Sequence, residues 1–151
     1  DPAIRSIRDY SALGFHDFVK DKIPVLGICL GMEMFFQQSQ EGKEKGLDIM
    51  SGEIVLLPDV MKIPHMGWNN LEIINDSKIL EGVDNNSWVY FVHSYRAKPT
   101  NEKIIVANAD YGIKVPAVVE NGLFFGTQFH PEKSGKVGSL MIKNFLRVCT
   151  K

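Results

Sequence analysis

One stretch of this chain indicates its fold: Pro24-Val25-Leu26-Gly27-Ile28-Cys29-Leu30-Gly31-Met32-Glu33-Met34-Phe35-Phe36. The apolar run Ile23–Ile28 is typical of a buried strand. Apolar residues at helical spacing follow it and predict a helix over Leu30–Gln40. A cysteine, Cys29, lies where the strand would become the helix, and a glycine stands two residues away on each side. The sequence therefore predicts a strand–turn–helix unit with a cysteine on the turn.

The pattern G-x-C-x-G at such a junction is typical of a nucleophile elbow. The sharp turn needs small neighbours and pushes the side chain of Cys29 out beyond the sheet. The positive end of the helix favours the thiolate, and the amide of Leu30 can donate to an oxyanion. The alternative is a small buried hydrophobic residue, as free cysteines usually are. The setting favours the nucleophile, whereas Cys149, in an amphipathic terminal helix, is expected to be structural or partly exposed.

The overall composition is that of an ordinary globular domain. The chain has 151 residues, of which 44% are hydrophobic and 23% charged, with a net charge of −1. This charge gives no argument for binding nucleic acid or an anionic membrane, and no apolar run approaches the roughly 18 residues that span a bilayer. Two cysteines make no disulfide framework and suit a reducing cytosol, and no zinc-type Cys/His spacing occurs. We expect a cytoplasmic protein with one domain over residues 1–151.

The remainder of the chain predicts an α/β domain that contains a mixed sheet. Two short helices are expected within residues 2–21, and a closing helix carries apolar residues from Val137 to Val148 at helical spacing. Asn121-Gly122 predicts a hairpin with a type I′ turn between the last two strands. Strands are expected at Ile54–Leu57, Leu71–Ile74, Trp88–His93, Ile104–Ala109, Val115–Glu120 and Leu123–Phe129.

A cysteine nucleophile needs a base, and His130 is the best-placed histidine. It follows an apolar strand, and sites in open α/β sheets form at the carboxyl ends of strands. Glu132 lies two residues on and can accept the ring N–H, although alone it would be a solvated loop carboxylate. The other histidines have weaker settings: His65 is expected in a loop, His93 could be a core histidine, and His16 a surface residue in an early helix.

The motifs Gly27-Ile28-Cys29-Leu30-Gly31 and Phe129-His130-Pro131-Glu132, in this order, resemble those of the class I glutamine amidotransferases. The resemblance spans nearly the whole chain. Three further stretches, Pro64–Asn69, Tyr90–Tyr95 and His130–Ser134, are most similar to the glutaminase subunits of imidazole glycerol phosphate synthase, in histidine biosynthesis. The resemblance implies a flavodoxin-like mixed sheet flanked by helices, a glutaminase activity without a cofactor, and a heterodimer in which the partner is a cyclase.

The resemblance also implies a role for particular residues. Cys29 would attack the amide carbon of glutamine, His130 would move protons, and Glu132 would orient His130. The Leu30 amide would form half of the oxyanion hole. The substrate pocket would include Gly31, Glu33, His93, Ser94 and Tyr95. Trp68, Tyr90 and Lys133 would lie at the face that docks the partner. Without the resemblance, the two aromatic residues could equally be core residues and Lys133 a solvated charge.

Two departures from the family pattern affect these expectations. Glu33 stands where the family usually has glutamine, so its charge could meet the substrate ammonium, or it could be an ordinary carboxylate near a helix N-terminus. The family domain also begins with strands and a glycine-rich loop that supplies the second oxyanion donor. No such loop precedes Cys29, and we expect these N-terminal strands to be missing from the given chain.

Other functions stay open at this stage. The chain could be an amidotransferase subunit of a different synthase, although the contexts of Trp68 and Lys133 argue against it. It could also be a scaffold that keeps the fold with a silent site. Glu33 and the missing N-terminal loop favour this alternative, and the set of Cys29, His130 and Glu132 disfavours it. The expected reaction makes glutamate and passes ammonia to a partner that forms imidazole glycerol phosphate and an aminoimidazole carboxamide ribotide.

Overall fold

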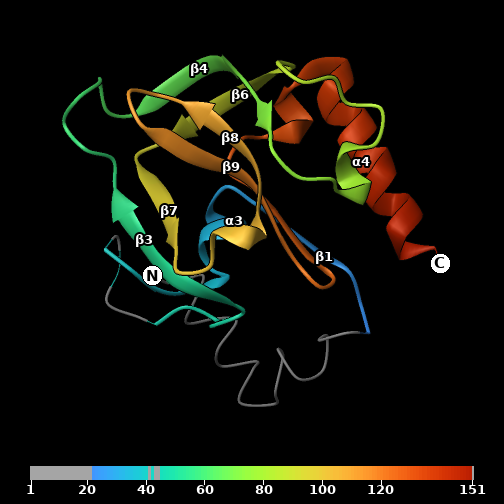
Figure 1. The fold of residues 1–151 in the computed structure, drawn as a ribbon, viewed down its shortest axis with the longest axis horizontal. Helices are drawn as coiled ribbons and strands as arrows, with labels where there is room; N and C mark the ends of the chain where they lie inside the picture. The colour runs from blue at the N-terminus through green and yellow to red at the C-terminus, as the bar shows by residue number, and fades with distance from the viewer. Residues whose placement is uncertain (1–21, 41, 43–44, 151) are drawn as a thin grey trace.

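The computed structural model describes residues 22–40, 42 and 45–150 (Figure 1). The helices expected within residues 2–21 lie outside this part of the chain. The first strand, β1 (Val25–Ile28), is followed directly by a one-turn helix, α3 (Leu30–Glu33). The strand–turn–helix unit predicted around Cys29 is therefore present, with a helix much shorter than expected.

The main sheet has five strands in the order β1-β10-β9-β8-β5. β1 runs parallel to β10 (Phe124–Thr127), and the other neighbours are antiparallel. The remaining strands of this sheet are β9 (Lys114–Asn121), β8 (Ile105–Asp110) and β5 (Glu72–Ile73). A mixed sheet of this kind agrees with the predicted α/β class, and it aligns the carboxyl ends of β1 and β10.

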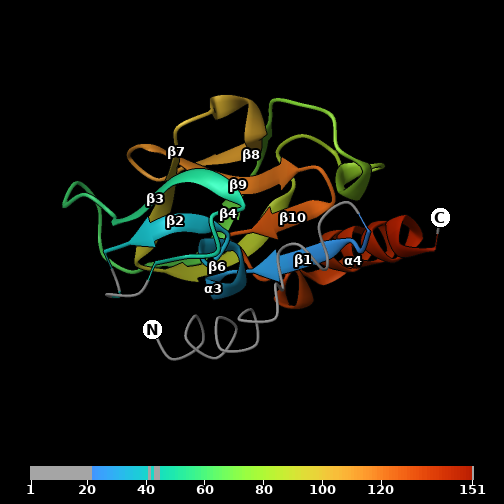
Figure 2. The ribbon, with the colours of Figure 1, turned by 90° about the horizontal axis from the view of Figure 1, so that it is seen from below.

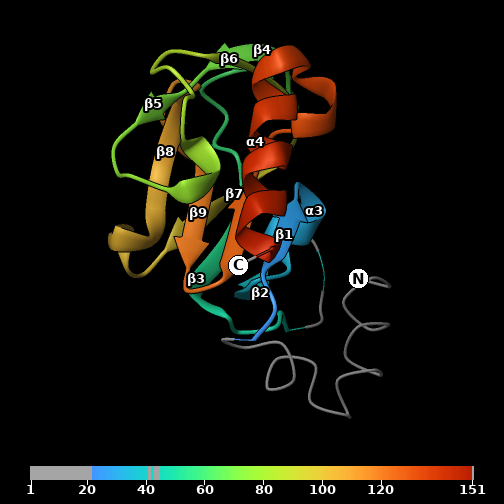
Figure 3. The same ribbon diagram turned by 90° about the vertical axis from the view of Figure 1, so that its right-hand side faces the viewer.

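Side chains alternate between the two faces of this sheet, as strand geometry requires. On one face, Phe125 and Val118 pack with Met141 of helix α4 (Gly135–Cys149), which lies along the sheet beside β1 (Figure 3). On the other face, Phe124 and Val119 pack with residues of the three-stranded sheet β2-β3-β7. Its strands are β2 (Phe36–Ser39), β3 (Met50–Leu56) and β7 (Tyr95–Pro99) (Figure 2). The main sheet thus separates two hydrophobic clusters.

The expected helix over Leu30–Gln40 is wrong beyond Glu33, because Phe36–Ser39 form strand β2 instead. β2 pairs in parallel with β3, with Phe36 opposite Met50 and Ser39 opposite Ile54. The carbonyl of Phe35 also accepts hydrogen bonds from the amides of residues 49 and 50. Two adjacent aromatic residues are favourable in strands, so pairing with a distant segment outweighs the helical spacing.

The hairpin between β9 and β10 is confirmed, but its turn type is wrong. Asn121 pairs with Phe124, so the two-residue loop is Gly122-Leu123 rather than one with Asn121 at its centre. Gly122 has φ +61°, whereas Leu123 is not among the positive-φ residues of the described chain. A type I′ turn needs positive φ at both central positions, so the loop has the pattern of type II′, with glycine first.

Strand β6 (Trp88–His93) has the predicted bounds and pairs with β4 (His65–Asn70), a segment expected to be a loop. β4 was missed because Gly67 interrupts it with φ +118° and Pro64 precedes it. Helix α4 is confirmed, but one of its apolar residues, Leu146, is exposed. The polar residue Asn144 is buried instead, and its side chain donates to the carbonyls of Ile79 and Glu81. Three short 3-10 helices complete the described part: η1 (Lys78–Leu80), η2 (Glu102–Ile104) and η3 (Pro131–Lys133).

Candidate active site

Cys29 occupies a strained position at the end of β1. Its φ of 54° and ψ of −107° are rare for a residue with a side chain, and such strain costs about 1–3 kcal/mol. Its amide donates to the carbonyl of Thr127 on β10 at 2.7 Å, and its carbonyl accepts from the amide of Glu33 at 3.1 Å. A Cβ on Gly27 would lie 2.7 Å from backbone atoms of Gly31. The turn therefore requires glycine at position 27, and its hydrogen bonds hold the cysteine at the edge of the sheet.

The thiol lies against strand β6 and a buried glutamine. Cys29 Sγ is 3.7 Å from the carbonyl oxygen of Val92 and 3.9 Å from Gln128 Nε2. The same nitrogen donates to Glu33 Oε2 at 3.1 Å. Gln128 is fully buried and Glu33 is 7% exposed. Gln128 therefore connects the thiol to the Glu33 carboxylate, a role that its position within an apolar strand did not reveal.

His130 reaches the same edge from the neighbouring strand. Ile28 of β1 pairs with Thr127 of β10, so Cys29 and His130 both follow the carboxyl ends of adjacent parallel strands. His130 Nδ1 lies 2.9 Å from Glu132 Oε2. Because a carboxylate accepts hydrogen bonds, Nδ1 is the donor and Nε2 of the neutral ring is free to accept a proton. The sequence correctly brought His130 and Glu132 together as a hydrogen-bonded pair.

Ser134, which received no role from the sequence, fixes the backbone at His130. Its hydroxyl accepts from the amide of Tyr90 at 3.0 Å and donates to the carbonyl of His130 at 2.6 Å. The amide of His130 in turn donates to the carbonyl of Tyr90 at 3.0 Å. Its place shortly after the His-Pro-Glu motif was the available signal. These bonds join the segment that carries His130 to strand β6.

The expected substrate segment lies at the end of β6, and its histidine is buried. His93 is 6% exposed, and its Nδ1 lies 2.6 Å from the carbonyl oxygen of Tyr95. Its Nε2 lies 2.9 Å from Nδ1 of His65, which is also buried. Ser94 is half-buried, and its carbonyl accepts from the amide of Leu57. Burial lowers the pKa of His93 to about 4, with the hydrogen bond to Tyr95 opposing and His130 adding to the effect.

Two of the three residues expected at a partner face, Trp68 and Lys133, are exposed, whereas Tyr90 is half-buried. Trp68 and Tyr90 pair across β4 and β6, with ring centroids 5.9 Å apart, and Trp68 is 54% exposed. Lys133, in η3, is exposed. At the elbow, Leu30 is 38% exposed and Gly31 is half-buried. Trp68 is therefore not a core aromatic residue.

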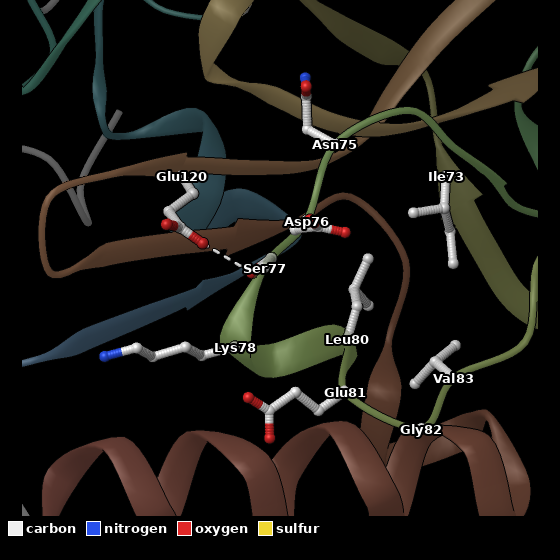
Figure 4. A pocket seen from close by; sticks show the side chains of 10 residues that line it. All are labelled: Ile73, Asn75, Asp76, Ser77, Lys78, Leu80, Glu81, Gly82, Val83 and Glu120. Atoms are coloured by element: carbon white, nitrogen blue, oxygen red, sulfur yellow. Dashed lines mark hydrogen bonds between the residues drawn. The ribbon is translucent and has the colours of Figure 1, made fainter.

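A separate cavity of about 610 Å³ lies between residues 73–83, which include η1, and strand β9 (Figure 4). Its wall includes Glu120, which pairs with Phe125 and accepts a hydrogen bond from Ser77 at 2.6 Å. Its lining residues include no cysteine and no histidine. Within the described residues, no group of three or more His, Cys, Asp or Glu could hold a metal ion, and no helix could cross a membrane.

A model of the class-I glutamine amidotransferase family matches residues 7–149, and the chain therefore belongs to that family. Its similarity within the family is to imidazole glycerol phosphate synthase subunit HisH. It is 47% identical to HisH of Methanocaldococcus jannaschii over 134 residues, which cover 88% of this chain and 68% of that protein. It is 47% identical to HisH of Archaeoglobus fulgidus over 129 residues, covering 84% and 65% of the two chains. The chain thus spans about two thirds of the length of these relatives.

Solved structures agree with the fold. A glutamine amidotransferase from Thermotoga maritima superposes with a TM-score of 0.62 at 18% identity, covering 93% of this chain and 54% of that one. A second glutamine amidotransferase structure gives a TM-score of 0.63 at 15% identity, covering 98% and 68% of the two chains. At these identities the likeness shows the fold alone, and it agrees with the predicted class.

Proposed function

We propose that this chain carries the glutamine-hydrolysing site of an imidazole glycerol phosphate synthase, and that Cys29 is its nucleophile. His130 takes the thiol proton as the sulfur of Cys29 attacks the side-chain amide carbon of glutamine. The C–N bond then breaks as His130 gives this proton to the leaving ammonia. The product is a thioester between Cys29 and the glutamyl group. Water then attacks the thioester carbon while His130 takes its proton, the C–S bond breaks, and glutamate leaves as the proton on His130 returns to the sulfur of Cys29.

One observation carries this proposal: a cysteine at positive φ and a histidine paired with a glutamate follow adjacent parallel strands. A triad needs a nucleophile, a base and a group that orients the base, and Glu132 can fill the last role through Nδ1 of His130. The carboxylate also stabilises the imidazolium that forms during proton transfer.

The elbow supplies the other groups that the reaction needs. The Leu30 amide is the first of α3, where an N–H has no partner within the helix, so it can donate to the oxyanion of the tetrahedral intermediate. Gly31 and Glu33 would bind glutamine. Because Gln128 holds Glu33 near the thiol, the carboxylate can meet the ammonium group of the substrate. Ser94 and Tyr95 would complete the pocket.

The similarity to HisH supports a cyclase as the partner, in a cytoplasmic heterodimer whose overall synthase reaction is of the lyase class. Exposed Trp68 would dock the partner together with Tyr90 and Lys133. The ammonia released at Cys29 would pass to the cyclase. K133A should weaken the activation of glutamine hydrolysis by the partner's ligand, and unchanged activation would count against its place at this face.

The test of the proposed function is Cys29→Ala in the full-length protein bound to its cyclase partner. Glutamine-dependent synthesis should disappear while ammonia-dependent synthesis continues. If glutamine-dependent synthesis survives, Cys29 is not the nucleophile. If both activities disappear, the variant has damaged folding or docking, which circular dichroism and gel filtration of the complex distinguish. A natural protein that uses ammonia but never glutamine would instead be a silent scaffold.

A further inference from the structure

Two buried histidines form a continuous hydrogen-bond chain beside the candidate active site. The chain runs from Asn69 through His65 and His93 to the carbonyl of Tyr95. His65 lies on β4 and His93 on β6, directly opposite each other in the ribbon that these strands form (Figure 1). The proposed mechanism uses neither ring for proton transfer, so this chain of hydrogen bonds needs a separate explanation.

The Tyr95 end of the chain determines where the protons lie. A backbone carbonyl can only accept, so Nδ1 of His93 must donate to Tyr95 at 2.6 Å. A neutral imidazole carries one N–H, so Nε2 of His93 must accept. Nδ1 of His65 is then the donor of the 2.9 Å bond between the rings. Nε2 of His65 is left as an acceptor.

The Asn69 end independently requires the same arrangement. Oδ1 of Asn69 accepts a hydrogen bond from the backbone amide of Asn70 at 2.8 Å. The Asn69 side-chain atom that faces His65 is therefore the amide nitrogen, Nδ2. Asn69 Nδ2 lies 3.2 Å from Nε2 of His65 and 3.0 Å from the carbonyl oxygen of Asp110, to which it donates. Since this amide nitrogen can only donate, Nε2 of His65 must accept. An added proton on either ring would therefore place two donors against each other.

We propose that His65 is a positioning residue that holds His93 in its neutral Nδ1–H form, so that a positive charge can form on His130 alone. The proposal rests on the proposed function, because it assigns the catalytic proton to His130. With both nitrogens of His93 already bonded, its ring cannot also bind glutamine through a nitrogen. The contribution of His93 to the site is then its shape and its lack of charge.

The surroundings of His65 favour this neutral form. Its ring stacks on Phe91 at 4.4 Å and on Tyr111 at 3.9 Å between centroids. Burial, reinforced by His93, lowers the pKa of His65 to about 4. Groups near the pair that can carry charge include Tyr111, which stacks on His65, and His130 with its partner Glu132 on the side of His93. A charge on His93 would oppose an imidazolium at His130.

The direct test is nitrogen-15 NMR of the histidine rings in the full-length protein between pH 5 and 8. His65 and His93 should both show a protonated Nδ1 and an unprotonated Nε2 throughout. An Nε2–H form of either ring, or a His93 cation above pH 5, would overturn the proposal. This readout does not depend on activity, so it stands even if the protein proves not to hydrolyse glutamine.

A matched pair of variants tests the consequence for catalysis. H65F keeps the stacked ring but removes the donor to His93, whereas H65N keeps an N–H near the position of Nδ1. At pH 6, H65F should lower kcat for glutamine hydrolysis about tenfold with a smaller change in KM, and the loss should shrink by pH 8. H65N should stay within about threefold of the natural protein.

Equal losses in the two variants, or a loss independent of pH, would mean that His65 has a packing role alone and would contradict the proposal. If H65F does not fold, H65N and the ring spectra of the natural protein decide the matter. An inactive natural protein with the expected ring spectra would instead refute the proposed function and leave the arrangement of the two histidines intact.

Discussion

The two cysteines of this chain differ in everything except their side chain. Cys29 is half-buried at a φ of 54°, between a strand and a one-turn helix, with its sulfur near a carbonyl and a buried amide. Cys149 is exposed at the end of a 15-residue helix. Exposure alone would make Cys149 the more reactive thiol. The comparison teaches that one chain presents the same side chain in two very different settings, and the proposed function assigns the nucleophile to the elbow beside the pair His130–Glu132.

The largest expected effect comes from exchanging the two cysteines separately. C29S should lower glutamine hydrolysis by at least about 10⁴-fold, because the nucleophile is lost. C149S should leave kcat/KM within about twofold, since an exposed substitution away from the site has little effect. Steady-state kinetics of the two variants measure both numbers. A large loss in C149S would remove the distinction between the cysteines.

The second test removes the carboxylate that is proposed to orient His130. E132Q should lower kcat by about 10² to 10⁴-fold, because the ring of His130 loses its preferred tautomer and the stabilisation of its charged form. The matched control is E72Q, which breaks the exposed contact between Glu72 and Lys114 and should leave kcat unchanged. Similar kinetics in the two variants would show that Glu132 is an ordinary surface carboxylate.

The third test uses pH, and its sign follows from the buried histidines. His65 and His93 have pKa values of about 4 in the folded chain, against 6.5 when exposed. Well above pH 6.5 both rings are neutral in the folded and in the unfolded chain, so they do not make the free energy of unfolding depend on pH. Between pH 6.5 and 4 the unfolded chain binds more protons, so the free energy of unfolding should fall by about 3 kcal/mol for each of the two histidines.

Urea unfolding at pH 7, 5.5 and 4.5 measures this loss. H65F has one titrating group fewer and should show a shallower fall than the natural protein. A fall of equal slope in both would mean that carboxylates alone account for the acid sensitivity, and that the buried histidines are not linked to folding.

The smallest expected effect concerns the glycine before the elbow. G27A would place a Cβ 2.7 Å from backbone atoms of Gly31 and from the ring of Phe35, and should destabilise the fold by about 1–3 kcal/mol. G31A is the control, because a Cβ there meets nothing within 4 Å. Thermal unfolding should separate the two variants. Equal midpoints would show that the turn tolerates a side chain at position 27.

Local patterns in the sequence predicted the elbow, strand β6 and the pairing of His130 with Glu132, because each depends on neighbours in the chain. The same reasoning failed at Phe36–Ser39 and at His65, where the partners are distant segments. Gln128 was hidden for the same reason, since its contacts with Cys29 and Glu33 join residues that lie nearly a hundred positions apart. Spacing along the chain carries no information about such contacts until the strands are aligned.

The most direct test of the central claim is labelling of the full-length protein with a glutamine-mimicking chloroketone, followed by peptide mass spectrometry. The account predicts one adduct, on Cys29, whose formation is suppressed by excess glutamine while exposed Cys149 reacts slowly and without protection. Labelling of Cys149 in preference to Cys29, or labelling of Cys29 that glutamine does not slow, would contradict the claim that the elbow presents a nucleophile to a glutamine pocket.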